Sequence, residues 1–276
     1  MSLPDVVVPV YDGTDALCAC LDALARTLPA TARLHLVDDA SPDPRVLPLM
    51  ERFAALAPFA VALHRQPRNL GFVGTVDAAM ARIAGDVVLL NSDTVPTRGF
   101  LARLAACAAV DPRIATATPF SNNAEICSFP LFCRDNPLPA DPEATAAACA
   151  AVGPAQYPDL PTGVGFCMYV RRAALDAIGG FDAETFGRGY GEENDFCRRA
   201  AGHGWRNVLC DDAFVAHRGG ASFAATAQRP GGRNLARLQA RYPGYHALVA
   251  DFIARDPLAP RRARIEAALR AGTAVP

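Results

Sequence analysis

The sequence predicts an α/β fold whose centre is a parallel, doubly wound sheet, and three observations carry this prediction. Segments typical of strands and of helices alternate along the first 118 residues. One of them, the apolar run Val87 to Leu90, is short and partly β-branched, which is typical of a strand buried on both faces. Polar residues stand directly after several predicted strands, at the edge where open α/β sheets bind their ligands.

Composition excludes several classes of protein. With 276 residues, of which 51% are hydrophobic, the chain can bury a large core and is not a disordered protein. The formal net charge of −1 gives no electrostatic reason to expect a nucleic-acid partner. Its nine cysteines are scattered, without CxxC pairs, so we expect a reducing, cytoplasmic compartment. No signal peptide or membrane-spanning run is evident, so we expect at most peripheral association with a membrane.

Each element of the first half has a local signal. Residues 5–10 are rich in valine, and Thr14 or Asp15 is expected to cap a helix that runs to Arg26 with leucines at helical spacing. The remaining elements of this half are predicted in strict alternation: a strand at 33–38, a helix at 44–57, a strand at 59–65, a helix at 72–84, a strand at 86–90, a helix at 100–109 and a strand at 114–118.

The second half is less regular. Residues 111–160 are rich in proline, asparagine and alanine and show no clear period before 144–152, so we expect a long excursion over the site. Gly179-Gly180 ends a short helix, and a glycine-rich loop follows it. The predicted elements of this half are a strand at 163–170, helices at 172–178 and 192–201, a strand at 207–216, and terminal helices at 234–241, 245–254 and 261–271.

Asn91-Ser92-Asp93 follows the buried strand directly, and Asp93 is the candidate metal ligand. A carboxylate oxygen is a preferred ligand of hard divalent cations, and such a cation neutralises the charge that develops on a leaving diphosphate. Asn91 stands where a second acid would help, and its neutral carbonyl is a weaker partner. The alternative is that Asp93 caps the helix expected to begin near Pro96.

Asp39 and the segment Asn69-Leu70-Gly71 also follow predicted strands. A carboxylate at Asp39 can accept a hydrogen bond from a ring N–H or a ribose hydroxyl, and Gly71 allows close approach of the backbone to a ligand. The alternative is that both segments only form turns, which aspartate, asparagine and glycine favour without any ligand.

Glu193 is the candidate general base, in a first helical turn that also contains Glu192 and Asp195. Three acidic groups in one turn repel each other, which raises the pKa of at least one of them. The alternative is that acids simply favour the positive end of a helix. Asp195 is at ion-pair spacing from Arg198 and Arg199, so we assign it a structural role.

His217 and Trp205 are weaker candidates. A neutral imidazole at His217 could be a further metal ligand facing Asp93, although a lone histidine is usually a satisfied, partly buried side chain. Trp205 could stack on an acceptor sugar, although a lone tryptophan in a turn more often packs into a core. The arginines between Arg255 and Arg270 could contact anionic lipid, but a solvated helix face is the better interpretation.

The ordered set of motifs resembles the family 2 glycosyltransferases, from about Val6 to Ser222. The nucleotide half of that family is matched by Pro9-Val10-Tyr11, Val37-Asp38-Asp39-Ala40-Ser41, Asn69-Leu70-Gly71-Phe72 and Leu90-Asn91-Ser92-Asp93-Thr94. The acceptor half and the closing histidine segment are matched by Pro161-Thr162-Gly163-Val164-Gly165-Phe166, Gly180-Phe181-Asp182, Gly191-Glu192-Glu193-Asn194-Asp195, Gly204-Trp205 and His217-Arg218-Gly219-Gly220-Ala221-Ser222.

The resemblance implies a GT-A fold with a Rossmann-like, mixed central sheet flanked by helices. It implies a glycosyltransferase domain at 4–225, with a nucleotide half at 4–118 and an acceptor half at 119–225, and a helical extension at 226–276. Carried over, Glu193 would be the catalytic base of an inverting transfer, and Asp93 and His217 would hold Mn²⁺ or Mg²⁺. The expected nucleotide contacts are Pro9, Tyr11, Asp39, Asn69, Gly71, Asn91 and Ser92, and the expected sugar contacts are Gly163, Glu192 and Trp205.

Two positions depart from the family pattern. The usual Asp-x-Asp is Asn91-Ser92-Asp93 here, and Glu193 stands where many relatives have aspartate. The expected donor is a UDP-, dTDP- or GDP-sugar, and the expected acceptor is a glycan or a lipid-linked sugar in the synthesis of a bacterial surface polysaccharide. Two alternatives remain open. One is a sugar nucleotidyltransferase, which would need a glycine-rich, basic phosphate loop after the first strand; the other is a nucleotide-sugar-binding module without turnover.

Overall fold

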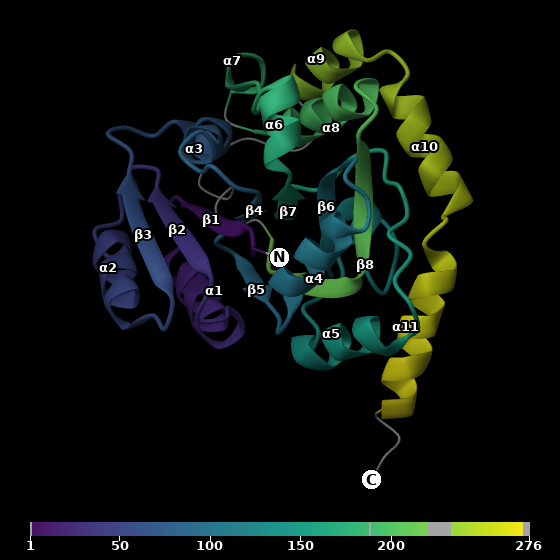
Figure 1. The fold of residues 1–276 in the computed structure, drawn as a ribbon, viewed down its shortest axis with the longest axis horizontal. Helices are drawn as coiled ribbons and strands as arrows, with labels where there is room; N and C mark the ends of the chain where they lie inside the picture. Colours follow the sequence, from purple (N-terminus) through teal and green to yellow (C-terminus); the bar gives the residue numbers. More distant parts are fainter. Residues whose placement is uncertain (1, 188, 220–232, 273–276) are drawn as a thin grey trace.

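The computed structural model describes residues 2–187, 189–219 and 233–272 and places them around one eight-stranded sheet (Figure 1). The strands are β1 (Asp5–Val10), β2 (Arg33–Asp38), β3 (Ala60–Arg65), β4 (Val87–Leu90), β5 (Thr94–Pro96), β6 (Ile114–Phe120), β7 (Cys167–Val170) and β8 (Arg206–His217). The helices are α1 (Thr14–Thr27), α2 (Val46–Leu56), α3 (Gly71–Met80), α4 (Phe100–Ala109), the 3-10 turn η1 (Glu125–Cys127), α5 (Pro142–Ala151), α6 (Arg172–Ile178), α7 (Ala183–Phe186), α8 (Glu192–Gly202), α9 (Arg233–Arg241), α10 (Tyr245–Arg255) and α11 (Ala259–Gly272).

The strand order is β3-β2-β1-β4-β7-β6-β8-β5, and the first four strands are parallel. This part of the sheet confirms the alternation of strand and helix in the sequence, because parallel neighbours require a crossover between them. The carboxyl ends of β1, β2 and β4 meet at one edge of the sheet.

The parallel pairing of the first half does not continue through the whole sheet. Strand β7 lies antiparallel between β4 and β6, and β5 pairs antiparallel with β8. The result is the mixed sheet that the family resemblance implies. Three short elements were not predicted at all: β5, η1 and α7. The expected cap of α1 is also wrong, because Gly13 precedes the helix and Thr14 donates its hydroxyl to Asp43 instead.

Alternating side chains of the strands separate the core into two layers. In β1, Val6, Val8 and Val10 pack toward the helices α1, α2 and α4. Val7 faces the other layer, formed largely by α3, α6 and α8. Since both faces of β1 and β4 are covered, β4 is apolar throughout and β1 is apolar from Val6 to Val10, as is typical of strands inside an α/β sheet.

The long excursion after β6 is held by two asparagine side chains. Asn136 accepts a hydrogen bond from Leu131 N–H and donates to the carbonyls of Leu131 and Arg134. Asn122 bonds the backbone N–H and C=O of His217, at the end of β8. The segment therefore packs against the strand ends, and α5 follows it with an N-cap at Asp141.

The terminal helices α9 to α11 run along one side of the molecule (Figure 1). None of the described helices is long and apolar enough to cross a membrane. Residues 220–232, which include Gly220-Ala221-Ser222 of the family motif, lie outside the described residues. The division into halves and a helical extension stays a prediction.

Candidate active site

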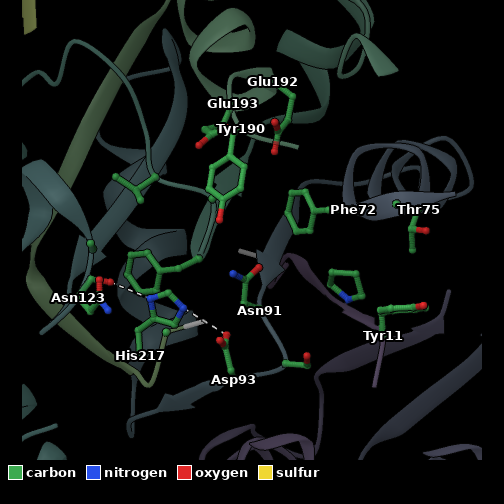
Figure 2. Close-up of a pocket in the computed structure, with 18 of the residues that line it drawn as sticks. Tyr11, Phe72, Thr75, Asn91, Asp93, Asn123, Tyr190, Glu192, Glu193 and His217 are labelled. Atoms are coloured by element: carbon green, nitrogen blue, oxygen red, sulfur yellow. Dashed lines mark hydrogen bonds and ion pairs between the residues drawn. The ribbon is translucent and has the colours of Figure 1, made fainter. Parts of the chain in front are cut away.

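A cavity of about 350 Å³ opens at the carboxyl ends of the parallel strands (Figure 2). It gathers residues that are far apart in the sequence, from the end of β1 to the end of β8. Of the predicted site residues, those that line the cavity are Pro9, Tyr11, Asp39, Asn69, Gly71, Asn91, Ser92, Asp93, Glu192, Glu193 and His217. The strand-end arrangement expected from the sequence accounts for this clustering.

Asp39 lies after β2 and is 3% exposed. Its carboxylate accepts hydrogen bonds from the backbone N–H groups of Leu70, at 2.7 Å, and Gly71, at 2.9 Å. These N–H groups belong to the start of α3, which has no side-chain cap of its own at Leu70. Burial raises the pKa of Asp39, while the two N–H groups oppose that rise. Asp39 thus both caps a distant helix and lines the cavity.

Asp93 and His217 meet at the opposite side of the view in Figure 2 from Glu192 and Glu193. The imidazole Nε2 of His217 lies 3.2 Å from Oδ1 of Asp93, and Nδ1 lies 2.7 Å from the carbonyl oxygen of Asn123. Burial would lower the pKa of His217, but the hydrogen bond and charge of Asp93, together with the Asn123 carbonyl, raise it overall.

This contact suits a cation. When Nδ1–H donates to the Asn123 carbonyl, the neutral imidazole directs the Nε2 lone pair at a carboxylate oxygen. Two acceptors in contact require a proton or a metal ion between them, and a carbonyl behind the second nitrogen is a common way to orient a metal-ligating histidine. No group of three or more histidine, cysteine, aspartate or glutamate residues that could hold a metal occurs in the described part of the chain. The Asp93–His217 pair therefore offers two ligands for a metal ion, and diphosphate oxygens and water can complete its coordination.

Glu192 and Glu193 begin α8, whose N-cap residue Gly191 provides no side-chain cap. Glu192 is 3% exposed, and its Oε2 and that of Glu193 have no hydrogen-bond partner among the described residues. Burial raises the pKa of Glu192 well above its ordinary value, and the charge of Glu193 adds to this. Burial also raises the pKa of Glu193. Both carboxyls are thus in an environment suited to proton transfer near neutral pH.

Asp195 is structural, as the sequence indicates. Its fully buried carboxylate is paired with Arg199 at 2.8 Å and with Arg241 of α9 at 2.7 Å, and it also accepts a hydrogen bond from the Tyr242 hydroxyl. Arg198, the other suggested partner, is not part of these pairs. Asp195 therefore points away from the Glu192–Glu193 pair and anchors the first turn of α8.

Gly163 and Trp205 do not line the cavity. Gly163 packs behind it, where its N–H contacts the Cys197 sulfur at 3.1 Å. Trp205 packs against the second core layer, which is the structural alternative that the sequence offered. Their proposed contact with a sugar has no geometric support in this structure.

The lining residues that were not predicted include Phe72, Thr75, Asn123, Glu125, Asp135 and Tyr190. Phe72 and Thr75 lie three residues apart at the start of α3, so helical spacing places them on one face of this helix. Asn123, Glu125 and Asp135 lie in the aperiodic excursion, and only the fold brings them to the cavity. The Thr75 hydroxyl is fully buried and makes no hydrogen bond of standard geometry with the described residues.

Comparison with known proteins identifies the family of this chain. Residues 4–231 match the model of a protein family described as "Glycosyltransferase like family 2". Curated relatives include uncharacterized proteins of Mycobacterium bovis and Mycobacterium tuberculosis, each 28% identical over 156 residues. That match covers 55% of this chain and 55% of each relative, so the chain spans about half the length of the curated relatives it matches.

Solved structures share the fold. The mannosyltransferase PcManGT from Pyrobaculum calidifontis, in complex with GDP-Man and Mn²⁺, aligns with a TM-score of 0.60 and 20% identity, over 99% of this chain and 75% of that one. GalNAc-T7 with UDP, GalNAc and Mn²⁺ aligns at 0.64 and 14% identity, over 96% and 55%. A fragment of S. aureus TarS in complex with UDP-GlcNAc aligns at 0.61 and 17% identity, over 90% and 71%. These similarities confirm the predicted GT-A fold.

Proposed function

The chain belongs to the family 2-like glycosyltransferases, and on this premise we propose that it transfers a sugar from a nucleoside-diphosphate sugar to a hydroxyl group of a glycan or lipid-linked acceptor. One observation carries the proposal: a buried carboxyl pair at the start of α8 and the Asp93–His217 pair line the same cavity. The first pair suits proton transfer, and the second suits a cation that balances a diphosphate.

Glu193 is the proposed general base. It accepts the proton of the acceptor hydroxyl while that oxygen forms a bond to the anomeric carbon, and the bond from this carbon to the diphosphate breaks. The leaving nucleoside diphosphate takes the electron pair. A single in-line displacement of this kind inverts the anomeric configuration. Glu192 is the neighbouring carboxyl, whose pKa burial also raises, and it is proposed to share a proton with Glu193.

Asp93 and His217 are the proposed ligands of Mn²⁺ or Mg²⁺. A bound divalent cation supplies Lewis-acid stabilisation of the charge on the leaving diphosphate. Asn123 holds the imidazole in place from behind, and Asn122 holds the backbone of His217. That two of the solved neighbours were obtained with Mn²⁺ and a nucleotide or nucleotide sugar supports the choice of metal and donor class.

The nucleoside end is proposed to lie at Pro9, Tyr11, Asp39, Asn69 and Gly71, with Asn91 and Ser92 toward the diphosphate. A cytoplasmic protein that acts in surface-polysaccharide synthesis, with at most peripheral contact with a membrane, remains the proposed setting. The sugar nucleotidyltransferase alternative loses support from the family match. A binding module without turnover remains the second candidate, because Asn91 replaces an acid of the usual motif.

A calorimetric titration with UDP, dTDP and GDP, each with Mn²⁺ and with EDTA, tests the site. We expect one nucleotide to bind, and we expect Asp93→Ala and His217→Ala to weaken the Mn²⁺-dependent part of the affinity by about 10- to 100-fold. His203→Ala, at an exposed position of the α8–β8 turn, is the matched control. Nucleotide binding that is indifferent to metal would contradict the roles of Asp93 and His217.

Glu193→Gln separates transfer from binding. We expect this variant to lose transfer by about 10²- to 10⁴-fold, because its amide cannot accept the proton, while nucleotide affinity stays within a factor of two. Product is followed by chromatography of a labelled sugar. A wild-type protein that binds nucleotide but never transfers, and a variant identical to it, would favour the binding module.

A further inference from the structure

The lining of the cavity is rich in acidic residues. Besides Glu192 and Glu193, Glu125 and Asp135 line the cavity, and so does Tyr190. Figure 2 shows Tyr190 next to the two glutamates, with its hydroxyl directed into the cavity. No arginine lines the cavity in the part of the chain that the structure describes, and the sequence contains no lysine.

Two of these carboxyl groups each have one buried oxygen without a hydrogen-bond partner among the described residues. Glu192 is 97% buried, lines the cavity and leaves Oε2 without a hydrogen bond to any described residue, as does Glu193. Buried carboxyl oxygens without partners are costly, and native structures satisfy more than nine in ten buried polar groups. These oxygens therefore indicate a ligand that brings hydrogen-bond donors.

The other two carboxyl groups are held by the ordered excursion after β6. Glu125 has a φ of 48°, and the turn around it is closed by the hydrogen bond from Ala124 N–H to the Ser128 hydroxyl. Asp135 lies between Arg134 and Asn136, and Asn136 binds the Arg134 carbonyl. Glu125 and Asp135 are both exposed and line the cavity, so their carboxylates are accessible to a ligand. Negative charge on the cavity lining is therefore carried by Glu125, Asp135 and one member of the Glu192–Glu193 pair, because burial favours a proton on that pair.

We propose that Glu125, Asp135, Glu192 and Glu193 form an acceptor subsite that binds a neutral or amino sugar through its hydroxyl and amino groups and excludes a ring that bears a carboxylate or phosphate. The inference rests on the proposed glycosyl transfer and names the acceptor class. Carboxylates accept hydrogen bonds from neighbouring hydroxyls, and an aromatic ring such as Tyr190 offers a face for a sugar ring. A sugar ring that bears a carboxylate or phosphate meets the negative charge of these side chains, and this repulsion excludes it from the subsite.

The test uses four methyl glycosides that share one pyranose ring and differ in charge: methyl glucoside, methyl glucosaminide, its N-acetyl derivative and methyl glucuronide. Their dissociation constants are measured by saturation-transfer NMR on the full chain without a donor. We expect the first three to bind and the glucuronide to bind at least about tenfold more weakly. Equal or tighter binding of the glucuronide, or no binding of any glycoside, would overturn the proposal.

The variants locate the effect. The gap is the difference between the logarithms of the dissociation constants of glucoside and glucuronide. Glu125→Gln combined with Asp135→Asn is expected to narrow this gap by about half or more. Glu184→Gln removes one charge from an exposed position of α7 and is expected to leave the gap unchanged. A gap that the double variant does not alter would overturn the assignment, and if the double variant does not fold, the wild-type ranking decides.

The result is independent of transfer. If no donor supports transfer while the charge ranking holds, the subsite stands and the proposed activity falls. If transfer proceeds to glucuronide as well as to glucoside, the acceptor class proposed here falls and the activity stands.

Discussion

Glu192 is the residue where burial and charge conflict most directly. Its carboxyl group is almost completely buried, has another carboxyl beside it, and has one oxygen without a partner. Its pKa is therefore raised well above the ordinary 4.5, and the folded chain holds a proton that the unfolded chain releases at neutral pH. The free energy of unfolding contributed by this group is full below pH 4.5 and is lost as the pH rises through the raised pKa.

Glu192→Gln is expected to abolish this loss of unfolding free energy at higher pH. The neutral amide needs no proton, so the variant should gain about 1 kcal/mol or more in free energy of unfolding over wild type at pH 7–8, and the difference should vanish toward pH 4.5. Urea titrations at several pH values measure it. Glu184→Gln, in exposed α7, is the control and should track wild type throughout. A difference that is constant with pH would show that the gain has another cause.

At the scale of elements, helix α9 is attached to the first turn of α8. Arg241 bonds both Asp195 in α8 and Asp182 before α7, and Asn234 donates to the carbonyls of Phe186 and Gly189. The turn that contains Glu193 is therefore supported by a helix from the end of the chain. Arg241 is a positioning residue, since it acts through Asp195 and contacts no reacting atom.

Arg241→Met is expected to lower kcat by about ten- to a hundredfold with little change in KM for the donor, because a small displacement of the base affects proton transfer more than nucleotide binding. Arg241→Lys should restore part of the loss, since it can keep one ion pair. The control is Arg255→Met, which breaks an exposed pair with Asp251 in α10. Steady-state kinetics would contradict the role of Arg241 if Arg241→Met and Arg255→Met reduced kcat equally, or if Arg241→Met raised KM alone.

At the scale of the whole molecule, α3 is joined to the segment before α7 at Gly180. Asp77 of α3 accepts a hydrogen bond from Phe181 N–H at 3.0 Å, and a Cβ at Gly180 would lie 1.9 Å from the same carboxylate oxygen. Only glycine leaves room for this contact.

Gly180→Ala is expected to lower the free energy of unfolding by about 1–3 kcal/mol, because Asp77 must move and the Phe181 N–H loses its partner. Gly202→Ala is the matched control: it has open space around the new methyl group and a helical position, so it should raise stability by about 0.4–1 kcal/mol. Denaturant unfolding distinguishes the two, and a destabilisation of the same size in both would contradict the steric argument.

How far the sequence predicts this molecule depends on the range of the interactions. Helices with clear periodicity, such as 100–109 and 172–178, were located to the residue, because their signal is local. The strand-end residues Asp39, Asn91 and Asp93 were placed together correctly, since parallel strands end at one edge. The direction of β7 was missed, because an apolar run gives no information on the orientation of its neighbours.

The remaining omissions are long-range. Strand β5 has three residues, too few for a period, and it exists only because β8 pairs with it. Glu125 and Asp135 reach the cavity through asparagine side chains that join distant backbone groups, and no local pattern encodes that path. Trp205 went to the core because a large apolar ring gains more from burial than from exposure.

The antiparallel insertion of β7 between β4 and β6 has a consequence for biosynthesis. As the chain leaves the ribosome, β4 emerges with one edge paired to β1 and the other bare, and its partner β7 follows only roughly eighty residues later. Apolar strand edges left open in this way recruit other chains. We therefore expect chaperones to shield this edge until the middle of the sheet is complete. We also expect the yield on expression to respond to chaperones more strongly than that of a fold whose neighbouring strands are made in succession.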